Sequence, residues 1–226
     1  MLILAADTSG KNGSLALATA QGSEKISVLE VVPLAGGTFS AQLIPQVHAL
    51  LSRHGLSRDS IDGFAVVSGP GSFTGLRVGL AAIKGLAEVL DKPLAAISLL
   101  EAIAVAAPKA SAGRLLAALD AGRGEAYVGE YQVTTAGPTL ISQDLVTHTD
   151  LVRLAPDATL VTPDSDLARK AEEGGRPAVK IDPPRADSIA RIGVGKIMAG
   201  EVVAADELEA NYIRRSDAEI FSKPKL

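Results

Sequence analysis

The strand-like and helix-like segments of this 226-residue chain come in nearly the same order twice. In the first half, the apolar runs and their periods predict three strands, then helix, strand, helix, strand and helix. In the second half, they predict three strands, a helix, a strand and two helices. The first set of strands is expected at LILAAD, SLALATA, ISVLEVV, Ile61–Val67 and Leu94–Ser98. Because strands alternate with helices in both halves, part of each sheet should be parallel.

The stretch PKASAG at Pro108–Gly113 has the composition of a linker between the two halves. We therefore expect an α/β protein of two related domains, 1–108 and 109–226, the second ending in a polar tail. Each domain should contain a mixed sheet flanked by helices. The clearest helices are expected at residues 40–54, 74–90, 99–107, 165–173 and 186–199.

Composition narrows the classes of function. Apolar residues make up 47% of the chain and aromatic residues only 3%, which suits α/β layers. The net charge of −4 argues against strong binding of nucleic acid by this chain alone. With no cysteine, disulfides, thiol catalysis and cysteine-ligated metals are excluded. The start, MLILAADTSG, resembles neither a signal peptide nor a membrane span, so we expect a soluble cytoplasmic protein.

A glycine-rich stretch, SGPGSFTGLRVG at Ser68–Gly79, joins a predicted strand to a predicted helix. It matches neither the Walker A pattern nor the G-x-G-x-x-G pattern. The helix N-terminus could still attract an anion through its backbone N–H groups. The alternative, which the spacing favours, is a sharp turn with Ser72 or Thr74 capping the helix.

The helix expected at 74–90 has two apolar faces. One consists of Leu76, Leu80, Ile83, Ala87 and Leu90, and the other of Gly75, Val78, Gly79, Ala82, Gly85 and Val89. A helix with one surface to bury needs only one apolar face, and glycine costs about 1 kcal/mol inside a helix. The second face therefore either packs within this chain or meets another chain. On the second alternative, Gly79→Leu should weaken association more than the fold.

Few residues suggest chemistry. His48, His54 and His148 have no metal-site spacing, so no metal site and no catalytic residues are expected. Asp7, Thr8 and Ser9 follow a buried strand and could hold a metal-bound phosphate, or simply form a turn. In LDAGRGEAYVGEY, at Leu119–Tyr131, charged residues cluster at an expected hairpin tip, where a surface turn with an ion pair is the default interpretation.

Several segments together resemble the TsaB (YeaZ) family of tRNA threonylcarbamoyladenosine biosynthesis proteins. They are ILAADTSGKNGSLAL, SGPGSFTGLRVGLAAIKGLA, PLAAISLLEAIA, LDAGRGEAYVGEY and NYIR, which span most of the chain. The resemblance implies a two-domain actin-like and sugar-kinase-like (ribonuclease H-like) fold with duplicated topology.

The resemblance also implies a noncatalytic subunit of a tRNA-modifying complex. Such a subunit dimerises with a catalytic TsaD-type subunit, which transfers threonylcarbamoyl to the adenosine next to the anticodon. A TsaE-type ATPase binds the pair, and a second copy can replace the TsaD-type subunit to give a homodimer. Contact with tRNA would be indirect, through the complex, and no membrane is involved.

By resemblance, the helices at 40–54 and 74–90 bind the partner. The partner-binding residues expected there are Leu43, Val47, Leu50, Gly75, Val78, Gly79, Ala82 and Gly85. No cofactor is required by this chain, although ATP or ADP could lie at the subunit interface, with Asp7, Thr8 and Ser9 as weak candidates for holding it.

Two departures from the family bear on chemistry. Where relatives often have a His-Ser-Glu-like stretch, this chain has Phe39, Ser40 and Ala41, which puts any acid–base or metal role there in doubt. Thr8 and Ser9 also stand where actin-like phosphate hairpins usually have glycines. The alternative function is an ATP-dependent phosphotransferase of the sugar-kinase type, with Asp7 as its essential residue.

Overall fold

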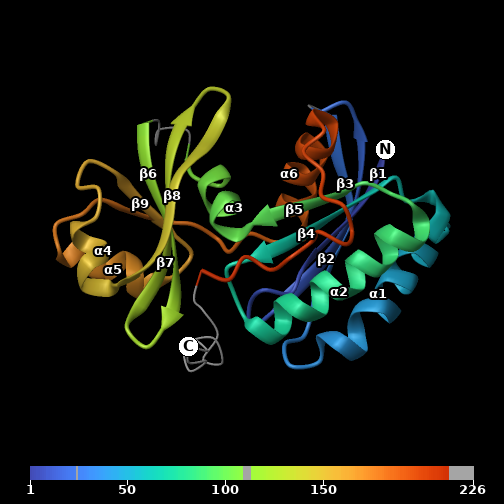
Figure 1. The fold of residues 1–226 in the computed structure, drawn as a ribbon, viewed down its shortest axis with the longest axis horizontal. Helices are drawn as coiled ribbons and strands as arrows, with labels where there is room; N and C mark the ends of the chain where they lie inside the picture. Colours follow the sequence, from blue (N-terminus) through green and yellow to red (C-terminus); the bar gives the residue numbers. More distant parts are fainter. Residues whose placement is uncertain (24, 109–112, 214–226) are drawn as a thin grey trace, which may run out of the picture. The chain divides into compact units, whose positions relative to one another are not determined.

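The computed structural model describes residues 1–23, 25–108 and 113–213 (Figure 1). Most of the expected linker and of the polar tail lies outside these residues. The chain divides into two compact units. The first unit contains Met1–Ala102 and Pro183–Ala210, and the second contains Ile103–Asp182 and residues 211–213. No helix among the described residues is long and apolar enough to cross a membrane.

The first unit is built on a five-stranded mixed sheet in the order β3-β2-β1-β4-β5. Its strands are β1 (Leu2–Asp7), β2 (Gly13–Gln21), β3 (Lys25–Leu34), β4 (Gly63–Gly69) and β5 (Leu94–Ser98). The first three strands pair antiparallel, whereas β4 pairs parallel with both β1 and β5. β1 is buried along its whole length, as a central strand covered on both faces should be.

Helices cover both faces of this sheet. Figure 1 shows α1 (Phe39–Arg53) and α2 (Phe73–Leu90) on one side and α6 (Ala186–Ala199) on the other. Thr8 at the end of β1 contacts α2, and Ser14 Oγ in β2 accepts a hydrogen bond of 2.9 Å from the Ala186 backbone N–H at the start of α6. A short turn of helix, Arg58–Ser60, and helix α3 (Leu99–Val105) complete the first half of the chain.

The second unit repeats the same sheet. Its strands are β6 (Gly113–Gly122), β7 (Glu125–Thr134), β8 (Gly137–Thr147), β9 (Thr159–Thr162) and β10 (Ala178–Lys180). Their order is β8-β7-β6-β9-β10, in which each strand number is five higher than that of the corresponding strand in the first sheet. The same pairs of strands are antiparallel and parallel in the two sheets. Helices α4 (His148–Arg153) and α5 (Ser165–Glu173) pack on its core. The expected duplicated α/β topology is therefore confirmed.

Two expectations from the sequence were wrong in detail. The sequence did not predict β10 in the second half, because three residues are too few to show a period. The segment from Pro183 to Ala210 was assigned to the second domain, but it packs with the first unit, because α6 covers one face of the first sheet against β1, β2, β4 and β5. The apolar period predicted both ends of α6 correctly, but it could not show which sheet the helix covers.

The charged run at Leu119–Tyr131 forms the hairpin between β6 and β7, as expected. Gly122 pairs with Glu125 across the ladder, so Arg123 and Gly124 make a two-residue turn. Both have positive φ, +59° and +79°, as the favoured hairpin turn requires. Glycine adopts that conformation freely, whereas Arg123 adopts it at a cost in energy.

Candidate functional site

The glycine-rich loop packs against the turn that follows β1. The Ser72 backbone N–H donates to the Ser9 carbonyl at 2.7 Å, and Thr8 Oγ1 donates to the Gly75 carbonyl at 2.7 Å. A β-carbon on Gly75 would clash with the Thr8 carbonyl, and one on Gly71 would crowd Ser9. These glycines are therefore needed for a close backbone approach inside the first unit.

Ser72 caps the helix that leaves this loop. Its side-chain oxygen accepts a hydrogen bond of 3.3 Å from the Gly75 backbone N–H, at the first turn of α2. The turn-and-cap interpretation of the loop is thus confirmed, with Ser72 rather than Thr74 as the cap.

The three weak candidates for cofactor binding, Asp7, Thr8 and Ser9, are all buried. Asp7 Oδ1 accepts two hydrogen bonds from Ser9, at 2.8 Å from the backbone N–H and 2.6 Å from Oγ. Burial raises the pKa of the Asp7 carboxyl above its ordinary value, and these two hydrogen bonds oppose the shift. The hydroxyls of Thr8 and Ser9 thus bond within the chain, which supports a role in forming the turn. Nucleotide binding here stays a prediction.

The buried carboxyl gives a testable dependence of stability on pH. A raised pKa means that the folded protein holds the Asp7 proton more tightly than the unfolded chain does, so ionisation destabilises the fold as pH rises above about 4. Asp7→Asn keeps an oxygen for the Ser9 donors and removes the charge. We expect the variant to gain stability relative to the wild type between pH 4 and pH 7, measured by urea unfolding at each pH. A constant difference across this range would contradict the assignment.

The residues expected to bind a partner fall into two groups. Five are buried inside the first unit, and for these the expectation was wrong: Leu43, Val47, Leu50, Gly75 and Gly79. The three leucine and valine side chains form the core-facing side of α1, against β2 and β3. Gly79 lies against the Thr8 side chain, with which any β-carbon would clash. The other three residues, Val78, Ala82 and Gly85, are half-buried or exposed.

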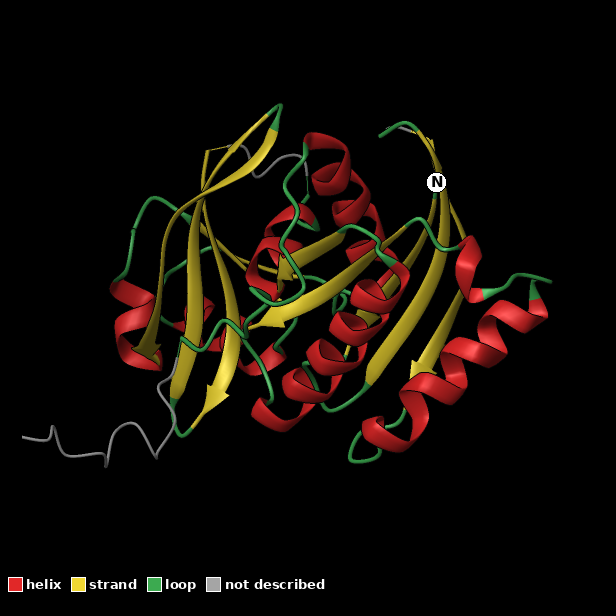
Figure 2. Ribbon diagram, turned by 45° about the vertical axis from the view of Figure 1, so that its right-hand side comes forward, coloured by secondary structure: helices red, strands yellow, loops and turns green. Residues whose placement is uncertain are grey.

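One further apolar residue of α2, Val89, continues this second group. Val78, Ala82, Gly85 and Val89 are spaced four, three and four residues apart, which places them in one stripe along the helix. We call these four residues the outer stripe of α2. Val89 is 77% exposed, and a β-carbon on Gly85 would meet no atom within 4 Å. Figure 2 shows α1 lying alongside α2, and α1 also exposes an apolar side chain, Ile44.

Phe39 explains one departure from the family pattern. Its side chain is buried at the start of α1, and its ring lies where β-carbons on Gly13 and Gly75 would come within 3.4 Å of it. An apolar ring at this position packs against backbone and offers no proton donor or metal ligand. Among the described residues, no group of three or more histidines and carboxylates could hold a metal ion.

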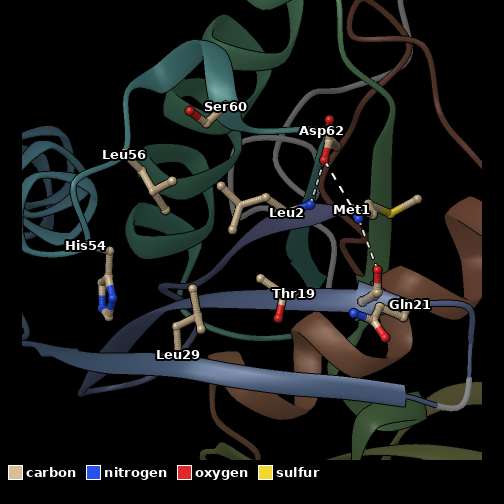
Figure 3. A pocket seen from close by; sticks show the side chains of 10 residues that line it. Met1, Leu2, Thr19, Gln21, Leu29, His54, Leu56, Ser60 and Asp62 are labelled. Atoms are coloured by element: carbon tan, nitrogen blue, oxygen red, sulfur yellow. Dashed lines mark hydrogen bonds and ion pairs between the residues drawn. The ribbon is translucent and has the colours of Figure 1, made fainter.

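A cavity of about 550 Å³ lies at the opposite end of the first sheet, beside the first residue of β1 (Figure 3). Leu2 and Leu29 lie in its middle, with His54 at one end and Asp62 at the other (Figure 3). Asp62 Oδ2 accepts a hydrogen bond of 2.7 Å from the Leu2 backbone N–H, and His54 Nε2 lies 2.9 Å from Glu30 Oε2. None of the site residues expected from the sequence lines this cavity.

The repeated sheet order and the helices on both faces of the first sheet agree with the two-unit actin-like fold that the family resemblance implies. The family model described as "TsaD: tRNA N6-adenosine threonylcarbamoyltransferase" matches residues 31–211. The solved structure described as YeaZ from Pseudomonas aeruginosa superposes with a TM-score of 0.75 at 26% identity, covering 93% of this chain and 99% of that one.

Two curated relatives carry the name tRNA threonylcarbamoyladenosine biosynthesis protein TsaB. That of Bacillus subtilis is 36% identical over 132 residues, which are 58% of this chain and 56% of the relative. That of Escherichia coli is 41% identical over 92 residues, 40% of each chain. The chain thus spans about half the length of the curated relatives it matches. It belongs to the TsaD family of tRNA N6-adenosine threonylcarbamoyltransferases, and within it to the TsaB (YeaZ) group.

Proposed function

We propose that this chain is a noncatalytic subunit of the complex that makes threonylcarbamoyladenosine in tRNA. It binds and activates a TsaD-type catalytic subunit through the exposed sides of α1 and α2. The observation that carries the proposal is the outer stripe of α2, a partly exposed apolar surface in a chain of the TsaB group. The TsaE-type ATPase would join the assembled pair, and tRNA would be reached through the complex.

Gly85 is the strongest single argument for a partner at this surface. Gly75 and Gly79 are explained by their contact with Thr8, whereas a β-carbon on Gly85 would meet no atom within 4 Å beyond its own stretch of helix. Glycine inside a helix costs about 1 kcal/mol relative to alanine. An incoming helix that packs closely on α2 would account for that cost, because small residues let two helix backbones approach.

The outer stripe has the spacing of a helix–helix contact. Steps of four, three and four residues keep side chains on one side of a helix over three turns, as in left-handed helical bundles. Ile44 exposes further apolar surface on the neighbouring α1. The same surface is open to a second copy of this chain, so we propose a homodimer when the TsaD-type subunit is absent.

A charge placed in the stripe tests the proposal. Val89→Asp should weaken binding to the TsaD-type subunit of the same organism at least tenfold in isothermal titration calorimetry, because the partner would bury a carboxylate without a counter-charge. Val202→Asp is the matched control, since Val202 is also exposed but lies in the segment after α6. Equal affinity of the two variants, both folded, would contradict the proposal.

Asp7 motivates the alternative function, an ATP-dependent phosphotransferase. It stands at the carboxyl end of β1, the edge at which open α/β sheets bind ligands. Metal-dependent ATP turnover by the isolated chain, lost in Asp7→Asn, would favour this alternative. No turnover and no nucleotide binding would remove it. ATP or ADP at an interface with the TsaD-type subunit is a separate proposal, tested by adding nucleotide to the calorimetry.

A further inference from the structure

A lysine, a histidine and an aspartate of the second unit form a continuous hydrogen-bonded chain. Lys170 Nζ in α5 lies 2.8 Å from His148 Nδ1, and His148 is the first residue of α4. His148 Nε2 lies 3.1 Å from Asp120 Oδ1 in β6 and 3.1 Å from the Glu125 carbonyl in β7. Lys170 and Asp120, which are 22 and 28 positions from His148 in the sequence, thus contact its two ring nitrogens.

The donor types fix the protonation of the imidazole. A lysine ammonium can only donate, so Nδ1 of His148 accepts its hydrogen bond and carries no proton. Nε2 then carries the proton and donates to Asp120 and to the Glu125 carbonyl. The amine, the imidazole and the carboxylate are therefore aligned in one proton path.

Hydrogen bonds from their backbone N–H groups hold His148 and Asp120 in place. The His148 backbone N–H donates to the Gly124 carbonyl at 2.9 Å, and the Asp120 backbone N–H donates to Asp164 Oδ2 at 2.7 Å. His148 is only 18% exposed, whereas Lys170 is exposed. The backbones that carry the base and its carboxylate are thus held, and the amine is accessible to a reagent from solvent.

We propose that Lys170 is a nucleophilic amine that accepts an activated acyl group. This arrangement is the one used to activate nucleophiles: the nucleophile is within hydrogen-bond distance of a base, and a third group orients the base. The site belongs to the second unit, whereas the helices of the proposed partner surface belong to the first, and it does not depend on the proposed function.

The step balances as follows. The Lys170 ammonium first loses one proton to solvent, which leaves a neutral amine hydrogen-bonded to His148 Nδ1. The lone pair of the neutral amine attacks the acyl carbon. The bond from that carbon to its leaving oxygen breaks, and the leaving group departs with the electron pair. His148 Nδ1 takes the second proton from the attacking nitrogen, and the Asp120 carboxylate stabilises the imidazolium that forms. The imidazolium then returns this proton to solvent.

Competitive acetylation of the full chain tests the proposal. Sulfosuccinimidyl acetate, supplied in deficit at pH 7, is the probe, and peptide mass spectrometry measures acetylation at each lysine. Lys180, an exposed residue of β10 in the same unit, is the internal reference. We expect Lys170 to react about tenfold faster than Lys180 or more, in line with general-base activation. In His148→Gln the ratio should fall close to one.

Each outcome either supports or overturns the proposal. A ratio near one in the wild type overturns the proposal. A high ratio that is unchanged in a folded His148→Gln protein also overturns it, because accessibility alone would then explain the reactivity. If His148→Gln fails to fold by circular dichroism, Asp120→Asn decides, since it keeps a hydrogen-bond acceptor for Nε2 and removes the charge that stabilises the imidazolium. A ratio lowered in Asp120→Asn supports the proposal, and an unchanged ratio overturns it.

Discussion

Replacing Gly79 with leucine is expected to destabilise the first unit rather than its association with a partner. A β-carbon at this position clashes with the Thr8 side chain, whose hydroxyl also holds α2 through the Gly75 carbonyl. Overpacking costs about 1–3 kcal/mol and the lost hydrogen bond about 1 kcal/mol, so the free energy of unfolding should fall by about 3 kcal/mol. Urea unfolding followed by far-ultraviolet circular dichroism measures it. This result reverses the expectation that sequence alone gave for the same variant.

Gly85→Leu is the matched control, because it makes the same change on the same helix. No atom lies within 4 Å of a β-carbon there, and leucine favours a helix over glycine by about 0.8 kcal/mol. We expect its free energy of unfolding to equal or slightly exceed that of the wild type. If the free energies of unfolding of Gly79→Leu and Gly85→Leu were equal, the close approach of Thr8 to α2 would be wrong.

Arg176→Met should destabilise the second unit by about 3 kcal/mol. The buried guanidinium donates to four carbonyls around the end of α4, those of Val152, Leu154, Ala155 and Ala158. The end of a helix leaves carbonyls without partners, and a cation there also interacts favourably with the helix dipole. A methionine of similar length fills the space but leaves these acceptors unpaired, and each costs about 1–3 kcal/mol if it stays buried.

Tyrosine fluorescence measures this effect selectively. The chain has three tyrosines and no tryptophan, and Tyr127, Tyr131 and Tyr212 all belong to the second unit. Arg169→Met is the control, because Arg169 pairs with Glu173 and Asp166 on an exposed side of α5, where ion pairs contribute under about 1 kcal/mol. If the two variants unfold at the same urea concentration, Arg176 does not stabilise the unit as the structure indicates.

Local patterns predicted the elements well but could not assign their neighbours. The apolar period of α2 predicted two apolar faces on this helix, and the structure has both of them. Only the structure shows that Gly75 and Gly79 meet Thr8, some seventy residues earlier, while Gly85 meets nothing. Every helix face with small residues looks alike in a sequence, because the contact that requires them is made by another part of the chain.

The candidate site in the second unit was missed for the same reason. From the sequence, His148 was noted only for its lack of metal-site spacing, and the charged residues of Leu119–Tyr131 were interpreted as a surface turn with an ion pair. The hydrogen bonds from Asp120 through His148 to Lys170 join β6, α4 and α5. These elements are far apart in the sequence, so no spacing rule could identify the site. The lone signal available was the charged run at Leu119–Tyr131, which supplies Asp120 and the Glu125 carbonyl.

The measurement that tests the central claim most directly is sizing by light scattering of this chain mixed with the TsaD-type subunit of its organism, with and without ATP. The account predicts a one-to-one complex with the wild type, and none with Gly85→Leu, whose side chain would block close approach of a partner helix while the fold stays intact. No complex with the wild type under either condition, or an undiminished complex with Gly85→Leu, would contradict it.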